Sequence, residues 1–281
     1  MTVATYAAAQ LLRVLPRERI TRAVGRLCDA RLHPLVSRLV VSAYSRAYRV
    51  DLDACVPPDG PYESFDAFFT RALRDGLRPG CVDEQAVVSP ADGRVASSGP
   101  VTEGGRLRIK GQPYRVEDLV GDPAEAARYE GGQFAVVYLS PRDYHRVHAP
   151  VAGKVTLIRS LPGDLFPVNS IGEQHIPGLF ARNRRVAIVI ETERQGRVTV
   201  VMVGAIVVGR ITVSVIDARD VPLGMHRIDP PAPVGRGDEI GVFHLGSTAV
   251  VFVERGVAPP WSREPGPVLM GEPLHDQGGA R

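Results

Sequence analysis

The stretch GVFHLGSTAVVFV, residues 241–253, decides the fold because it sets a small polar step between two apolar runs near the C-terminus. The runs on both sides are rich in valine and phenylalanine, which is typical of β-strands. The Gly-Ser-Thr step can be an ordinary turn, since glycine and serine are common turn residues. It can equally be a reaction centre, because glycine leaves its own carbonyl open to attack by the next side chain. Position and composition alone leave both interpretations open.

The chain has the same character from about residue 81 onward. Short runs rich in valine and isoleucine alternate with Gly, Pro, Asp and Asn. The runs are VVSPADGRVASS, FAVVYLSPRDYH, GKVTLIRSL, RRVAIVIETE, VTVVMVGAIVVGRITVSVID, EIGVFHLGS and AVVFVE. Strands with turn signals between them predict a β sandwich or barrel, and the chain lacks the sustained strand-helix alternation of a doubly wound sheet. We therefore expect a predominantly β, sandwich- or barrel-like core over residues 81–281.

Residues 1–80 are predicted to be a helical region ahead of this core, which makes the fold class α+β. Pro16 can begin one helix and Pro34 a second. In the second helix, residues at helical spacing form an apolar side, which comprises Leu35, Val36, Leu39, Val40, Ala43 and Ala47. Ser64 is placed to cap a short third helix whose phenylalanines turn inward. The final GEPLHDQGGAR, residues 271–281, is expected to be a frayed tail.

Positive charge is concentrated in residues 1–50, which hold nine arginines against Glu18 and Asp29. The whole chain has a formal net charge of only +3, so the remainder is net acidic. Basic amphipathic helices suit an anionic membrane surface. From periodicity alone, a solvated helical layer packed on the protein's own core is the simpler interpretation. Nucleic-acid binding is not expected, because no recognition motif or aromatic platform accompanies the basic region.

Composition indicates a globular chain of 281 residues, 44% apolar and 23% charged. Its three widely spaced cysteines suggest neither a disulfide framework nor a metal site, and they suit a reduced, cytosolic setting. Lys110 and Lys154 are the only lysines, so few residues could hold pyridoxal phosphate as a Schiff base. The longest apolar run, residues 198–209, is shorter than the ~20 residues that span a bilayer. Any membrane contact is therefore expected to be peripheral.

Three further motifs lie in the β-rich part. SPADGRV, residues 89–95, can be an Asp-Gly turn between strands. YHRVHAP, residues 144–150, carries two histidines three positions apart, which alone suit metal binding, a shared helical face or a loop. LPGDLFPVN, residues 161–169, has the composition of a Pro/Gly-rich loop. Each motif by itself has an ordinary structural explanation.

Taken together and in this order, these motifs and LGST resemble the phosphatidylserine decarboxylases. An upstream FF-x-R...RP element within residues 68–79 also matches this family. Four residues match its functional positions: Asp92, His145, His148 and Ser247. The resemblance implies that the Gly246–Ser247 bond is broken and that Ser247 becomes a covalent pyruvoyl cofactor. The products would be a large chain, 1–246, and a small chain, 247–281, that stay together as a heterodimer, with a homodimer of these as a further option.

The same resemblance implies a role for each residue. Ser247 attacks the carbonyl of Gly246 to form an ester. Because a serine hydroxyl needs activation at neutral pH, His148 is its base and Asp92 is the carboxylate that orients the base. The pyruvoyl group then forms a Schiff base with phosphatidylserine and is the electron sink as CO2 leaves. His145 donates or positions the proton that completes phosphatidylethanolamine, and no metal is involved.

A lipid substrate favours the membrane interpretation of the N-terminal helices. We expect residues 1–80 to hold the protein at the cytoplasmic side of the cell membrane, as a peripheral protein, and residues 81–281 to be the catalytic domain. Two alternatives stay open. One is a pyruvoyl-dependent decarboxylase of a soluble amino acid, which would keep the same processing. The other is a non-catalytic β-rich binding module, which would have no reason to cleave before Ser247.

Overall fold

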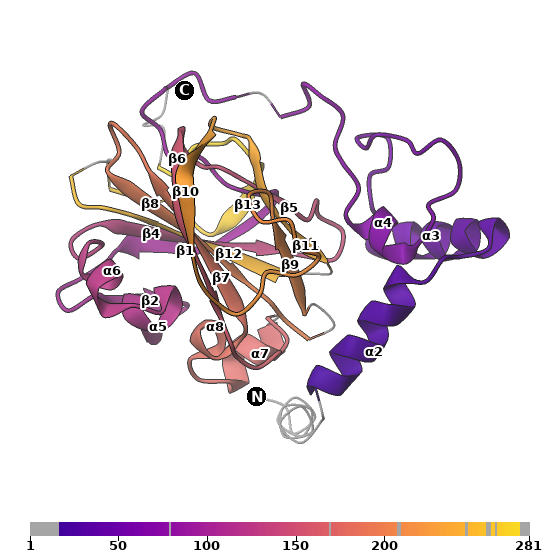
Figure 1. The fold of residues 1–281 in the computed structure, drawn as a ribbon, viewed down its shortest axis with the longest axis horizontal. Coiled ribbons are helices and arrows are strands. Elements are labelled where there is room, and N and C mark those ends of the chain that lie inside the picture. The colour runs from indigo at the N-terminus through magenta and orange to yellow at the C-terminus, as the bar shows by residue number, and fades with distance from the viewer. Residues whose placement is uncertain are drawn as a thin grey trace.

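Two antiparallel sheets form the core of the protein (Figure 1). The computed structural model describes residues 17–78, 80–168, 170–206, 209–244, 247–256, 260–261 and 263–275, with the backbone alone for residues 17, 18, 170, 171 and 247. The large sheet has eight strands in the order β10-β6-β7-β8-β12-β4-β1-β13, and the small sheet has the order β5-β11-β9. Strands β2 and β3 form a separate hairpin.

The valine-rich runs predicted most of these strands. The large sheet contains β1 (Gly93–Pro100), β4 (Gln133–Leu139), β6 (Gly153–Leu161), β7 (Arg185–Glu191), β8 (Arg197–Val203), β10 (Gly224–Val234), β12 (Ser247–Val253) and β13 (Gly266–Val268). The small sheet contains β5 (Arg146–His148), β9 (Arg210–Val213) and β11 (Glu239–His244). The hairpin contains β2 (Arg106–Ile109) and β3 (Gln112–Arg115). The GVFHLGSTAVVFV stretch therefore forms β11 and β12, and it crosses from the small sheet into the centre of the large one.

Both faces of the large sheet are buried. Because side chains alternate along a strand, Val186 and Ile188 of β7 belong to one apolar core and Ala187 belongs to another. The first core lies between the two sheets and includes Phe243 of β11. The second core is covered by the hairpin and by short helices. Burial on both faces explains why β7 and β8 have nearly continuous apolar sequences instead of alternating ones.

Four short helices interrupt the β-rich part and were not predicted. They are α5 (Val116–Val120), α6 (Pro123–Ala127), α7 (Ser170–His175) and α8 (Leu179–Arg182). Proline at the start of α6 and the side chain of Asp122, which accepts from the backbone N–H of Glu125 at 2.7 Å, set where that helix begins. These helices are only four to six residues long, so they carry little helical periodicity in the sequence.

The predicted α+β class with a β-rich core is confirmed, in the form of packed sheets and not a closed barrel. Strand β10 was missed because GMHRIDPPAPV contains three prolines. Proline cannot donate to a ladder and is confined to edge strands, and β10 is an edge of the large sheet. The prediction of a frayed tail was wrong for residues 271–275, because Leu274 is fully buried and its N–H donates to the Val87 carbonyl at 3.0 Å. Residues 276–281 lie outside the described residues.

The N-terminal helices lie at one side of the core, beside the small sheet (Figure 1). They are α2 (Arg17–Asp29), α3 (Pro34–Tyr48) and α4 (Phe65–Phe69). The Ser64 hydroxyl accepts from the N–H of Ala67 at 3.1 Å, which confirms the predicted cap, and Phe68 and Phe69 are fully buried. The third helix ends at Phe69. No helix in the described part of the chain is long and apolar enough to cross a bilayer.

Helix α3 presents its apolar side to solvent, which reverses the simpler sequence interpretation of a helical layer packed on the core. Leu35 is 67% exposed and Leu39 is 70% exposed. The residues of α3 that are buried are Ser37 and Val41, and the Ser37 hydroxyl donates to the Tyr62 carbonyl at 2.6 Å. The polar side of α3 therefore faces the core, and its apolar side is not covered by any described part of the chain.

Candidate active site

The predicted scissile bond lies between β11 and β12. Gly246 and Leu245 lie outside the described residues, as does the side chain of Ser247, so the ends of the two strands locate the bond. The backbone of Ser247 is in register with Leu139 of β4. Thr248, the next residue, is fully buried, and its Oγ1 has no hydrogen-bond partner among the described residues. Because buried polar atoms are normally paired, an orphaned hydroxyl here fits a site that gains a further polar group.

The structure brings the SPADGRV and YHRVHAP motifs together. The backbone N–H of His148 donates to the carbonyl of Pro90 at 2.7 Å. The carbonyl of His145 accepts from the N–H of Phe243 at 3.0 Å, which ties the histidine strand β5 to β11 just before the predicted scissile bond. Gly93 begins β1, and a side chain there would lie 2.3 Å from the Tyr138 carbonyl of β4. Glycine at position 93 therefore lets β1 approach β4 closely, in addition to any role in a turn.

His148 is buried and held at both ring nitrogens. Nδ1 lies 2.7 Å from the carbonyl of Gly237, and Nε2 lies 3.0 Å from the hydroxyl of Tyr144. Because a carbonyl only accepts, Nδ1 carries the proton and Nε2 accepts from Tyr144. Burial lowers the pKa of His148 below its ordinary value, against the raising effects of the Gly237 hydrogen bond and of the charges on Glu239 and Asp92. The imidazole is thus neutral near pH 7, as a base must be.

Asp92 makes different contacts from those a catalytic triad requires. Its carboxylate accepts two hydrogen bonds from Arg78, one from Nε to Oδ1 at 2.8 Å and one from Nη2 to Oδ2. It also accepts from the backbone N–H of Met270 at 2.8 Å. His148 Nδ1 donates to the carbonyl of Gly237 and not to Asp92, whose charge raises the pKa of His148. The role of Asp92 as the carboxylate that orients His148 stays a prediction. Sequence reasoning missed Gly237 and Tyr144. A backbone carbonyl 89 positions away leaves no signal in a motif.

His145 occupies a separate environment from His148. Its ring is fully buried and lies against Phe69, with centroids 4.1 Å apart. Nδ1 is 2.8 Å from the carbonyl of Asp143, so it donates there, and Nε2 has no partner among the described residues. Burial lowers the pKa of His145 to about 3. The resting imidazole is therefore an acceptor at Nε2, and the expectation that it donates a proton holds only after it has first received one.

The FF-x-R element positions His145. Phe69 supplies the ring that covers the imidazole, and the buried guanidinium of Arg71 donates from Nη2 to the carbonyl of Arg142 at 3.0 Å and to that of Asp143 at 3.5 Å. The carbonyl of Asp143 is the same one that accepts from His145 Nδ1. Arg71 therefore fixes the group that sets the tautomer of His145. Pro79 of the same element lies outside the described residues.

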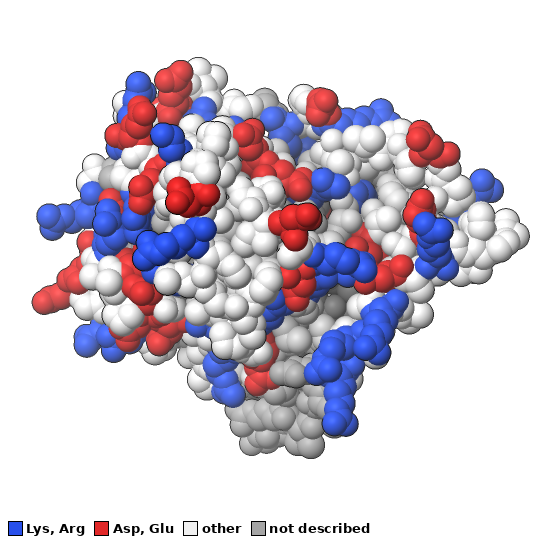
Figure 2. Space-filling view, viewed as in Figure 1, with Lys and Arg blue, Asp and Glu red and all other residues white. Residues whose placement is uncertain are grey.

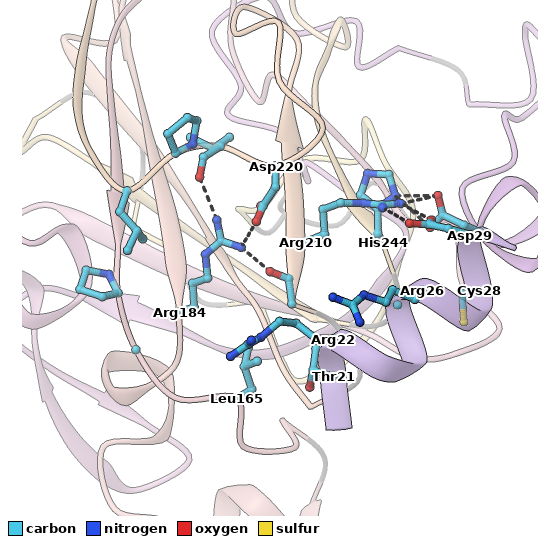
Figure 3. Close-up of a pocket in the computed structure, with 18 residues that line it drawn as sticks. Thr21, Arg22, Arg26, Cys28, Asp29, Leu165, Arg184, Arg210, Asp220 and His244 are labelled. Atoms are coloured by element: carbon cyan, nitrogen blue, oxygen red, sulfur yellow. Dashed lines mark hydrogen bonds and ion pairs between the residues drawn. The ribbon is translucent and has the colours of Figure 1, made fainter. Parts of the chain in front are cut away.

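A cavity of ≈ 530 Å³ opens between α2 and the β-core, beside His244 at the end of β11. Its inner end is closed by a charged network in which Arg210 of β9 donates to Asp29 of α2 at 2.6 Å and to Asp66 of α4 at 2.7 Å (Figure 3). His244 Nδ1 lies 2.9 Å from both carboxylate oxygens of Asp66. The LPGDLFPVN loop contributes Leu165 to the wall. The network ties two N-terminal helices to the strand that leads into the predicted scissile bond.

His244 and Asp66 were missed by sequence reasoning, because they lie 178 positions apart and neither forms a recognisable motif. Among the described residues, no group of three or more His, Cys, Asp or Glu side chains could hold a metal ion. The candidate site therefore includes a predicted nucleophile at a strand junction and two buried neutral imidazoles. A cavity with charged walls lies beside His244, and neither His145 nor His148 lines it. These are the parts that an activated serine and a charged substrate would need.

Known proteins resemble this chain along most of its length. The family profile described as phosphatidylserine decarboxylase matches residues 65–275, from α4 to the packed C-terminal segment. A relative from Anaeromyxobacter sp., named phosphatidylserine decarboxylase proenzyme, is 42% identical over 271 residues, or 94% of this chain and 95% of its own length. Proteins of the same name from Acinetobacter baylyi and Shewanella loihica are 41% and 39% identical, over 86% and 85% of this chain and 85% and 86% of their own lengths. The chain therefore belongs to the phosphatidylserine decarboxylase family.

Proposed function

We infer that this chain is a self-processing enzyme that decarboxylates phosphatidylserine to phosphatidylethanolamine and CO2. The observation that carries this inference is the roughly two-fifths identity to proenzymes of that name along nearly the whole of both chains. The site supports it, because the matching residues supply two buried neutral imidazoles. His145 lies beside the end of β11, whereas His148 is in register with Glu239 at the start of that strand. What the structure adds is the set of contacts that would prepare each residue for its step.

Self-cleavage is proposed to begin with Ser247. Its hydroxyl oxygen attacks the carbonyl carbon of Gly246, its proton goes to His148 Nε2, and the C–N bond breaks as the departing amine takes a proton. Removal of the α-proton of residue 247 then expels the Gly246 carboxylate and leaves a dehydroalanine. Addition of water and loss of ammonia convert that group to pyruvoyl. Tyr144 occupies His148 Nε2 in the resting state, so its hydroxyl must turn away or relay the proton.

A pyruvoyl group, once formed, supplies an electrophilic carbonyl for the substrate amine and an electron sink for decarboxylation. The orphaned Thr248 Oγ1 next to it could donate to such a carbonyl. His145 Nε2 can take a proton from the substrate ammonium and later return one to the α-carbon. A substrate carboxylate nearby would favour the protonated imidazole and so assist this exchange.

The two products are proposed to remain one heterodimer. Strand β12 begins at Ser247 and is paired along its length with β4 on one side and β8 on the other. A cut before Ser247 therefore leaves the small chain contributing a central strand, whose side chains Val250, Val251 and Phe252 are fully buried. Separation would expose this strand and both of its neighbours, which is costly in water. A homodimer of these heterodimers remains a further proposal.

Peripheral attachment to the cytoplasmic side of the cell membrane is proposed to use the N-terminal helices. The uncovered apolar face of α3, with Leu35 and Leu39, offers side chains that could enter the interface of a bilayer. Figure 2 shows basic side chains gathered along α2, where they would meet anionic head groups. An exposed apolar helix face has no evident use in a decarboxylase of a soluble amino acid. The lipid substrate is therefore favoured over that alternative.

The experiment that tests this function combines a gel with an assay. Purified wild-type protein should run as two chains, and it should release CO2 from phosphatidylserine in mixed micelles but not from free serine. Release from serine at a comparable kcat/KM would favour the soluble-substrate alternative. A single intact chain that binds but does not turn over the lipid would favour the non-catalytic module.

A further inference from the structure

Among the described residues that line the cavity beside His244, Arg26 of α2 is a cation without a partner in the cavity wall. Arg184 donates to Asp220 at 2.8 Å and to the carbonyl of Val221 at 2.8 Å, and Arg210 is bound by Asp29 and Asp66. Arg26 of α2 also lines the cavity, but it makes no hydrogen bond or ion pair with any described residue. Figure 3 shows its guanidinium extending from α2 into the space between the helix and the core. This placement leaves a fork of donors facing an open volume.

The chemistry of a guanidinium indicates which ligand it would take. Its planar donors match carboxylate and phosphate oxygens, and they are arranged for two parallel hydrogen bonds. The carboxylates of the cavity wall are already engaged with Arg184 and Arg210. An anion from outside would complete the site. The volume of ≈ 530 Å³ lies within the ~300–1,000 Å³ of small-molecule pockets, which is more than a simple ion needs.

The walls of the cavity combine charged and apolar side chains. The charged network of Asp29, Asp66, Arg210 and His244 closes the inner end. Leu223 lines the cavity and is 58% exposed. A molecule with both charged and apolar parts would match this mixed lining.

Given the proposed function, on which this inference rests, we propose that the cavity holds the phospholipid head group and that Arg26 binds its phosphodiester. The serine moiety then extends toward His244 at the end of β11, and the glycerol and acyl chains leave past Leu223. Arg26 is a substrate-binding residue in this arrangement and takes no part in the chemistry. It discriminates a phosphoserine head group from free serine, because free serine has no phosphate to offer it.

Binding can be measured without turnover in the Ser247→Ala chain. The probe is dihexanoyl-phosphatidylserine below its micelle concentration, titrated by calorimetry. Arg26→Gln should weaken its Kd by roughly ten- to a hundredfold, since a hydrogen bond to a charged group is lost. The matched control is Arg31→Gln, which removes an equal charge from an exposed position just beyond α2. It should change Kd by no more than about twofold, because general attraction to an anion is weak in salt.

Two further probes separate a head-group site from a simple anion site. Glycerophosphoserine should compete with the lipid in wild type and lose most of its affinity in Arg26→Gln, whereas inorganic phosphate should compete at least tenfold more weakly. Equal competition by inorganic phosphate would overturn head-group recognition. So would an unchanged Kd in Arg26→Gln. If wild type decarboxylates the lipid while Arg26→Gln binds it normally, this inference fails and the proposed function stands. If lipid binding depends on Arg26 but wild type does not turn the lipid over, the proposed function fails and the binding role of Arg26 stands.

Discussion

The burial of His145 makes a quantitative prediction about stability against acid. In the folded protein its pKa is about 3, compared with 6.5 for an ordinary histidine. The unfolded chain therefore takes up a proton as the pH falls below about 6.5, while the folded chain does not until about pH 3. Stability from this group is fully present above pH 6.5 and is lost as the pH falls toward 3. Each pH unit in that window is worth ~1.4 kcal/mol.

The test compares His145→Asn with its parent, both carrying Ser247→Ala so that each is a single chain. Asparagine keeps a donor for the Asp143 carbonyl, but it has no proton to gain. Between pH 7.5 and pH 4.5 the parent should lose about 3 kcal/mol more of its unfolding free energy than the variant. His148 contributes its own acid loss to both proteins, so that term cancels in the comparison.

Urea unfolding followed by fluorescence at the two pH values gives the four free energies required. An equal acid loss in the parent and in His145→Asn would refute the reasoning. It would show that His145 is protonated in the fold or exchanges readily with solvent, and hence that its Nε2 is not a resting acceptor.

Three other results are expected. His148→Ala should abolish self-cleavage, as judged on a denaturing gel. Asp92→Asn should slow it by only roughly tenfold, because the carboxylate influences His148 by its charge and not by a hydrogen bond. Complete loss of cleavage in both variants would indicate direct contact between Asp92 and His148. Arg71→Lys should lower kcat for decarboxylation by about tenfold or more with little change in KM, since lysine cannot bind two carbonyls with one planar group. An unchanged kcat would show that Arg71 does not position His145. Leu35→Gln with Leu39→Gln should reduce sedimentation with anionic vesicles by about tenfold or more while activity on short-chain lipid persists; undiminished sedimentation would assign membrane contact elsewhere.

The sequence was most informative where a physical pattern repeats. Valine-rich runs identified the strands, since burial on both faces of the large sheet selects the same residue types at every position. The Ser64 cap was also predictable, because a hydroxyl before an apolar run has a local partner. By contrast, periodicity in α3 defined an apolar face but not which way it points. Packing of Ser37 against the Tyr62 carbonyl decides that orientation, and it lies 25 positions away.

The candidate site shows the same division. The motifs marked the residues that the fold gathers, and the backbone contact between His148 and Pro90 agrees with that expectation. Their hydrogen-bond partners were not predictable, because the fold supplies them from distant segments. Gly237 offers a main-chain carbonyl that any residue could provide, and Arg78 takes the carboxylate of Asp92 that the triad pattern would give to a histidine. Motifs thus predict which side chains take part, whereas tertiary structure decides what each one contacts.

The most direct test of the central claim is the intact mass of the purified wild-type protein. Self-cleavage at Ser247 predicts two chains, residues 1–246 and 247–281, with the smaller one lighter by the mass of ammonia than a fragment that begins with serine. Ser247→Ala should give one chain of full length. A wild-type protein that decarboxylates phosphatidylserine as a single uncut chain, or a small chain that begins with an ordinary serine, would contradict the claim that Ser247 becomes the reactive carbonyl.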